Sequence, residues 1–204
     1  MQNIFTKIVR VAFVCALLAV ISATEARAQQ WSVSTNLVEW GNLGTINGEV
    51  GVGVSQHFSL FVNARYNNWT FRKGVPEDRY EDPYGETEVQ FENRKMAFAA
   101  GVRFWPWYTY SGWWLYLRGQ YMEYNRGGLI RHIAEEGDAY GGGVGFGYTY
   151  MLHKNWNIEF GAGVWAGYKD YKIYRCTNCG GVLEDSKKFF FLPDDVFISL
   201  IYVF

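Results

Sequence analysis

The chain has 204 residues and a formal net charge of −1, with 19 Lys and Arg against 20 Asp and Glu. This balance, without any basic run, excludes nucleic acid as an expected partner. Aromatic residues make up 19% of the chain and 23 residues are glycine, while helical periodicity is almost lacking. Such a composition favours many strands packed around a closed or bent sheet.

The first 28 residues have the pattern of a secretory signal peptide. Lys7 and Arg10 precede an uncharged apolar run over 11–21, and Ala26 and Ala28 form an A-x-A cleavage site. The apolar run is well short of the about 20 residues that a membrane-spanning helix needs. We therefore expect residues 1–28 to be removed and residues 29–204 to form one exported barrel domain. Secreted soluble proteins and outer-membrane proteins both begin in this way.

After the signal peptide, apolar and polar residues alternate with a period of two between polar turns. The predicted strands are, in chain order, 31–40, 46–55, 58–71, 94–107, 113–125, 138–152, 156–174 and 195–204. Short connections alternate with the long loops 72–93, 126–137 and 175–193, and only the first loop breaks this rule. Short periplasmic turns and long external loops are typical of outer-membrane barrels. The pattern predicts an all-β fold, an eight-stranded antiparallel up-and-down transmembrane β-barrel.

One face of each predicted strand holds bulky apolar residues, and the other holds glycines and charges. Five charged residues fall mid-strand on the polar face, namely Glu49, Arg65, Arg103, Arg118 and Glu159. An Arg or Lys that faces lipid at the midplane costs about 2–4 kcal/mol, so these groups are expected to point inward. The interior of an eight-stranded barrel is just wide enough for side chains to fill. We expect Glu49 and Glu159 to pair with some of the three arginines and to plug the lumen. A lipocalin-like soluble barrel would have the opposite orientation, with its apolar face inward.

The chain ends on the strand "FISLIYVF", which places Ile198, Leu200, Tyr202 and Phe204 on one face. The last strand must pair with the first to remove both open edges of the sheet. This ending resembles the C-terminal strand of outer-membrane barrels, which the barrel-assembly machinery recognises. The tryptophans near the predicted strand ends fit the aromatic belts of such proteins.

Several segments resemble the Bacteroidota barrel family catalogued as domain-of-unknown-function family 3575. They are residues 35–69, "GDAYGGGVGFGYTY", "KNWNIEFGAGVW", the C-x-x-C-G of residues 176–180, and "ISLIYVF". The resemblance covers nearly the whole chain after the signal peptide. It implies an OmpA/OmpX-like barrel in the cell outer membrane, surrounded by outer-membrane lipid, whose role is undefined. Such proteins are sometimes considered beside fimbrial or surface-assembly proteins, so a surface or fimbrial protein is one possible partner.

The remaining motifs give weak indications of chemistry. Cys176 and Cys179 are expected to form a disulfide in an exported protein, with half a zinc site or a redox dithiol as alternatives. His57 and Ser59 have the spacing seen in lipid A deacylases, but they lie at a predicted periplasmic turn. We expect no catalytic, cofactor or metal site. The expected function is a structural or surface-interaction role through the external loops. A lipid-modifying enzyme and a lipocalin-like carrier are the alternatives.

Overall fold

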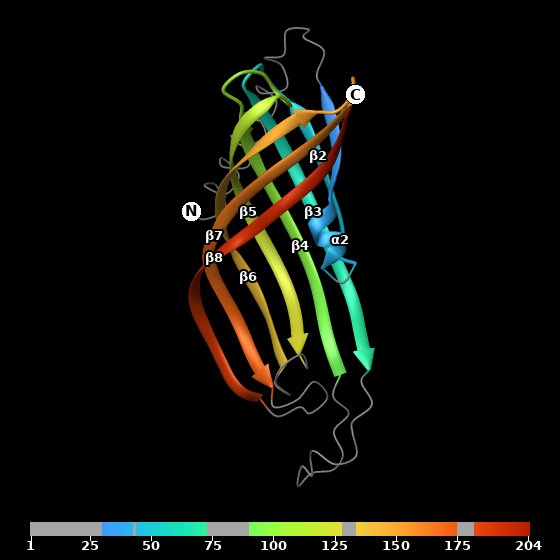
Figure 1. Cartoon of the computed structure of the whole chain (residues 1–204). Coiled ribbons are helices and arrows are strands. Elements are labelled where there is room, and N and C mark those ends of the chain that lie inside the picture. Colours follow the sequence, from blue (N-terminus) through green and yellow to red (C-terminus); the bar gives the residue numbers. More distant parts are fainter. Residues whose placement is uncertain (1–29, 43, 73–89, 128–133, 175–181) are drawn as a thin grey trace, which may run out of the picture. The chain divides into compact units, whose positions relative to one another are not determined.

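The computed structural model describes residues 30–42, 44–72, 90–127, 134–174 and 182–204 (Figure 1). The elements are β1 (Trp31–Asn36), α2 (Leu37–Gly41), β2 (Ile46–Gly53), β3 (Phe58–Arg72), β4 (Gln90–Phe104), β5 (Gly112–Gly127), β6 (Ala134–Met151), β7 (Trp156–Tyr174) and β8 (Val182–Val203). Within these ranges, no helix is long and apolar enough to cross a membrane.

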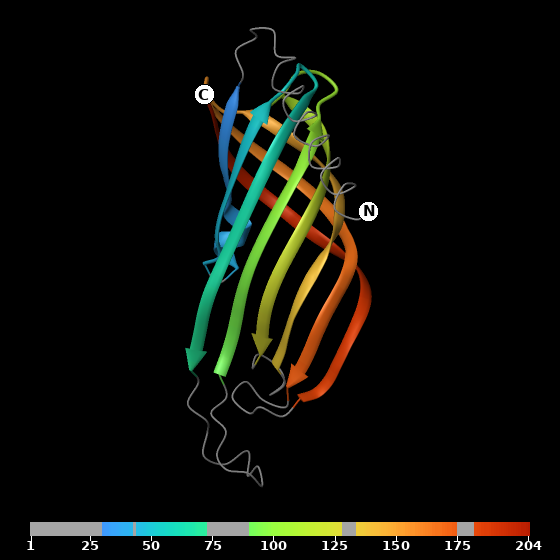
Figure 2. The same ribbon diagram turned by 180° about the vertical axis from the view of Figure 1, so that it is seen from behind.

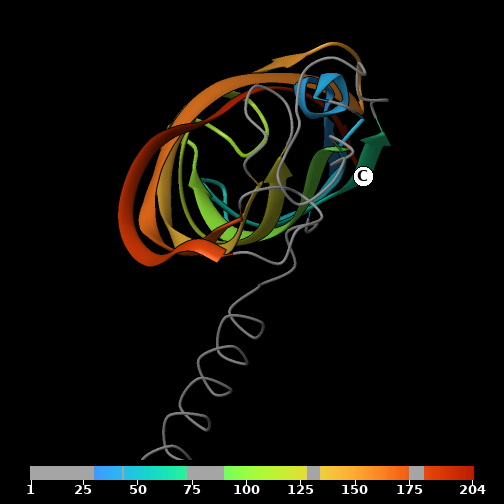
Figure 3. The ribbon, with the colours of Figure 1, turned by 90° about the horizontal axis from the view of Figure 1, so that it is seen from below.

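The strands form a closed antiparallel barrel in the order β1 to β8, as the alternating sequence predicts. β8 closes the barrel by pairing with β1, from Ser32 opposite Val203 to Asn36 opposite Ser199. The amide of Phe204 continues this edge and donates to the carbonyl of Trp31 at 2.9 Å. Figure 3, a view from below, shows the strands arranged around one lumen.

The predicted first strand, 31–40, is wrong beyond Asn36, where the chain turns into the short helix α2. The Asn36 side chain caps this helix by accepting a hydrogen bond from the amide of Val38 at 3.0 Å. Strand alternation would place Glu39 on the same face as Trp31 and Val33. The helical turn instead buries Glu39 and leaves Leu37 and Trp40 exposed.

The predicted ends of the long strands are also wrong, because the strands continue into segments that the sequence reading assigned to loops. β4 begins at Gln90 rather than 94, β6 at Ala134 rather than 138, and β8 at Val182 rather than 195. Cross-strand ion pairs join the extensions of β6 and β8 to β7. Lys187 lies 2.7 Å from Asp170, and Lys169 lies 2.7 Å from Glu135. Charged residues paired in this way can form regular strands without any apolar alternation.

Candidate functional site

The half of the lumen near the short turns is filled by aromatic side chains. This aromatic plug consists of Phe61, Trp105, Tyr110, Trp114, Tyr116 and Phe197, all of them buried. Trp114 stacks on Phe197 with ring centroids 5.6 Å apart and an interplanar angle of 19°. The ring centroid of Trp105 lies 5.8 Å from that of Trp114, with the two planes tilted by 47°. These buried rings therefore pack against one another inside the barrel.

Inward glycines of β6 and β7 make room for the aromatic plug. A Cβ atom on Gly147 would lie 2.5 Å from Trp114 Cζ2 and 2.7 Å from the carbonyl oxygen of Phe160. Added Cβ atoms on Gly145 and Gly161 would likewise overlap the rings of Tyr116 and Phe197. The glycine-rich segment of β6 is therefore a packing feature of the lumen.

Arg103 lies inside the aromatic plug and joins two acidic residues. Its Nη2 atom lies 2.5 Å from Glu49 Oε1 and 3.9 Å from Glu159 Oε2. The guanidinium also sits 4.6 Å from the ring centroids of both Phe61 and Trp114. Arg103 and Glu159 are buried and Glu49 is partly buried, each near an opposite charge, which is the condition under which buried charges are tolerated.

The other two arginines of the expected lumen network lie elsewhere in the lumen. Arg65 pairs with Glu39 of α2 at 3.4 Å, and Lys95 reaches the same carboxylate oxygen at 3.4 Å. Arg118 lies over the ring of Tyr116 at 5.2 Å. The sequence analysis did not name Glu39, because it treated residues 31–40 as one continuous strand. The spacing Asn36-x-x-Glu39, followed by Gly41, is a helix-start and helix-end signal that could have identified the turn.

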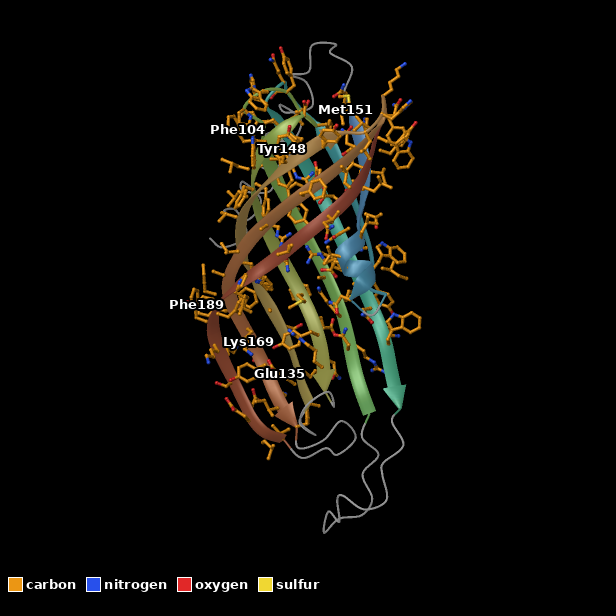
Figure 4. All side chains as sticks on the ribbon, in the orientation of Figure 1. Phe104, Glu135, Tyr148, Met151, Lys169 and Phe189 are labelled. Atoms are coloured by element: carbon orange, nitrogen blue, oxygen red, sulfur yellow. The ribbon has the colours of Figure 1, made fainter. Side chains whose placement is uncertain are left out.

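A second group of charges lies in the lumen at the far ends of the strands. Figure 4 shows Glu135 and Lys169 there, on neighbouring strands well away from Phe104 and Tyr148. Glu135 accepts hydrogen bonds from Lys169 and from the Tyr124 hydroxyl, both at 2.7 Å. Burial alone would raise the pKa of Glu135, but the bonds from Lys169 and Tyr124 and the nearby positive charges outweigh burial and lower it.

The lowered pKa of Glu135 predicts that the end of the barrel opposite the short turns is sensitive to acid. Because Glu135 has a lower pKa in the folded than in the unfolded chain, its stabilisation is complete above the unfolded value. It is lost as the pH falls through the folded value. We expect the hydrogen-exchange protection factors of β6 residues 135–138, which correct for the slower intrinsic exchange in acid, to fall on acidification. In E135Q this acid-induced loss of protection should be missing. Equal pH profiles of protection in both proteins would contradict the role given to Glu135.

The outer surface of the barrel carries an apolar band that ends at a charged rim. On β5 the outward residues Trp113, Leu115, Leu117 and Tyr121 are exposed. The next outward side chain after Tyr121 is that of Glu123. The outward side chains of β7 and β8 also change from aromatic to charged towards this rim. On β7, Tyr168 is followed by Asp170 and Lys172, and on β8 their partners are Phe189, Lys187 and Asp185. Trp31, Trp107, Trp113 and Trp156, all exposed, lie at the short-turn end.

The C-terminal residues lie on this outer face. Tyr202 contacts Trp156 and Phe204 through edge-to-face rings, with centroids 5.0 and 4.9 Å apart. Phe204 is exposed, and Ile198 and Leu200 are partly exposed on the same face of β8. The short-turn end of the outer surface is thus bordered by aromatic rings.

Other motifs lie outside the site or outside the described residues. Cys176, Cys179 and residues 73–89 lie outside the described residues. Ser59 is buried and accepts a hydrogen bond from Trp105 Nε1 at 2.9 Å, while His57 Nδ1 lies 3.0 Å from the Trp105 carbonyl oxygen. The pair therefore supports the packing of Trp105. Among the residues with described positions, no group of three His, Cys, Asp or Glu could hold a metal ion.

These features define a small closed barrel of eight antiparallel strands with ionic and aromatic groups inside and apolar residues outside. The family model described as "Protein of unknown function (DUF3575)" matches residues 12–204, and the chain belongs to this family. The comparisons with curated proteins and with solved structures gave no match.

Proposed function

We propose that this protein is an outer-membrane barrel with a plugged lumen, which acts at the cell surface through its external end. The observation that carries the proposal is the apolar outer band combined with buried charges inside. On β5 the band runs from Trp113 to Tyr121. Nine residues of about 3.4 Å each, tilted by about 40°, rise roughly 23 Å, close to the apolar height of about 25 Å in known barrels. The signal peptide and the aromatic C-terminal strand support the same location, with insertion by the barrel-assembly machinery.

The orientation follows from the two ends of the barrel. The short turns and the C-terminus lie together at one end, at the top of Figure 1. Barrels of the outer membrane place short turns in the periplasm and long loops outside. The charged strand extensions of β6, β7 and β8 then project beyond the outer leaflet. They form a rigid, charged support for the external loops, and loops on rigid scaffolds are common binding sites.

The aromatic plug predicts that the barrel does not conduct ions. Purified protein in a planar bilayer is expected to show no unitary conductance steps, because Arg103 and the surrounding rings occupy the lumen. A plug-opening variant, W114A/F197A, provides the matched comparison and is expected to increase leak. Regular single-channel steps in the unaltered protein would contradict the plug.

The surface role predicts a separation between folding and partner binding. Residues 75–88, which are outside the described residues, belong to the longest expected external loop. Their deletion is expected to leave the barrel folded, judged by its heat-modifiable mobility in gels, and to abolish surface cross-linking to a protein partner such as a fimbrial subunit. K154A, in a turn at the opposite end, serves as the control. Unchanged cross-linking in the deletion variant would exclude this loop as the binding region.

A further inference from the structure

The strand pairing of the wall is interrupted beside α2. β1 and β2 have 6 and 8 residues, whereas the flanking strands β3 and β8 have 15 and 22. β2 pairs with β3 only as far as Tyr66, and β1 pairs with β8 only from Ser199 onward. Within the described part of the chain, β8 from Val182 to Phe197 has a strand partner on one edge only. The opposite side of the barrel, in Figure 2, shows β3, β4 and β5 side by side without such a break.

On β8 this break extends into the apolar outer band. The outward residues Phe189, Phe191 and Val196 are 56%, 65% and 72% exposed. Leu192 faces the lumen, because it is paired with the buried Trp165, and yet it is 55% exposed. Both faces of β8 are therefore accessible here. In a bilayer, an unpaired strand edge is tolerated only where water, protein or a polar ligand reaches its backbone groups.

Two rows of inward residues run from this break around the inner wall of the barrel, through β8, β7, β6 and β5. One row is Leu192, Trp165, Gly143 and Arg118. The second row, one step nearer the long-loop end of the barrel, is Phe190, Gly167, Gly141 and Gln120. The glycines carry no side chain, so backbone lines the wall between the polar residues and β8. A Cβ atom on Gly143 would lie 3.4 Å from Arg118 Nε and 3.5 Å from Trp165 Cβ, so these two atoms border the same glycine from its two neighbouring strands.

Two polar atoms in these rows are buried without a hydrogen-bond partner among the described residues. They are Nε1 of Trp165, a residue 3% exposed, and Oε1 of Gln120, a residue 7% exposed. Such groups are rare, because each costs about 1–3 kcal/mol when unsatisfied. The indole N–H can donate to an oxygen, and the Gln120 amide can accept or, after rotation, donate. Together with the Arg118 cation, this set suits an oxygen-bearing, negatively charged group.

We propose that these rows bind the carboxylate head of a single-chain fatty acid that enters sideways from the outer leaflet between β8 and β3. The head lies among Trp165, Gln120 and Arg118, and the acyl chain extends past Leu192 into the hydrocarbon. A peptide strand added to the free edge is the less favoured occupant, because Lys187, Lys188 and Pro193 are residues that oppose edge-to-edge pairing.

Equilibrium binding of radiolabelled palmitate to the protein in phospholipid nanodiscs tests this proposal. We expect saturable binding that is at least tenfold weaker in W165F/Q120L, whereas W113F, altered on the outer face, binds like the unaltered protein. Lysophosphatidylcholine of the same chain length distinguishes a free acid from a phospholipid-derived ligand, and we expect it to compete at least tenfold less well.

A second variant covers the case in which the double variant fails to fold. Leu192 is exposed, so L192D leaves buried packing intact while placing a negative charge at the entrance, and it is expected to weaken palmitate binding at least tenfold. Non-saturable binding, or equal affinity in L192D and the original, would overturn the proposal. The inference depends on the membrane location but not on the surface partner. Its failure in a correctly inserted barrel therefore leaves the proposed function intact.

Discussion

Replacing Arg103 with Met is expected to lower the free energy of unfolding by about 3–5 kcal/mol, the range measured when one partner of a buried ion pair is removed. The loss has two sources in this lumen. Glu49 and Glu159 are left without their shared cation, and the contacts of the guanidinium with Phe61 and Trp114 are lost. Urea unfolding of the barrel in phospholipid vesicles, followed by tryptophan fluorescence, measures the change.

Two further variants separate the ionic effect from a general sensitivity to arginine loss. R94M removes an exposed cation next to the apolar band and is expected to change stability by less than about 0.5 kcal/mol. The triple variant R103M/E49Q/E159Q removes all three charges and is expected to recover part of the loss, because no unpaired buried charge remains. A stability of R103M equal to that of the original chain would show that the network contributes nothing.

Replacing Gly147 with Val is expected to destabilise the barrel by about 1–3 kcal/mol, the usual cost of overpacking a filled interior. The added atoms meet Trp114, which is fully buried against Phe197, and the backbone of Phe160, so neither neighbour can easily move. The same unfolding measurement applies.

Gly119 provides the matched control for this substitution. It is a strand glycine on the outer face, and a Cβ atom there meets nothing within 4 Å. G119V is therefore expected to be neutral or slightly stabilising, since Val favours extended strands more than Gly does. If G147V were as stable as G119V, the glycines of β6 would not be there to admit the aromatic plug.

The period-two alternation was sufficient to predict the closed eight-stranded barrel, its strand order and the closing pair β1–β8. It failed where other forces determine the backbone. Residues 134–137 and 182–194 are strands although they lack the apolar alternation. Both segments pair with β7, which supplies backbone pairing along their length and, at Lys169, an opposite charge for Glu135. At α2, a single capped turn reverses the face on which Glu39 lies.

The contents of the lumen were only partly accessible to sequence reasoning. Inward charges follow from strand parity, which places Glu49, Arg103 and Glu159 on the polar face. Which acid meets which arginine depends on the register between strands distant in sequence. Arg65 therefore meets Glu39, while Arg103 lies between acids of β2 and β7. The break beside β8 depends on the unequal lengths of β1, β2, β3 and β8, which the alternation did not define.

The most direct test of the membrane placement is a nitroxide scan along β5, residues 112–123, with the barrel inserted in phospholipid vesicles. The proposed orientation predicts high oxygen accessibility and low accessibility to a water-soluble nickel complex at positions 113, 115, 117, 119 and 121. It also predicts a shift towards the aqueous reagent at 123, where the charged rim begins. Water-accessible labels at 115 and 117, or lipid-exposed labels at 116 and 118, would contradict an apolar face turned towards hydrocarbon.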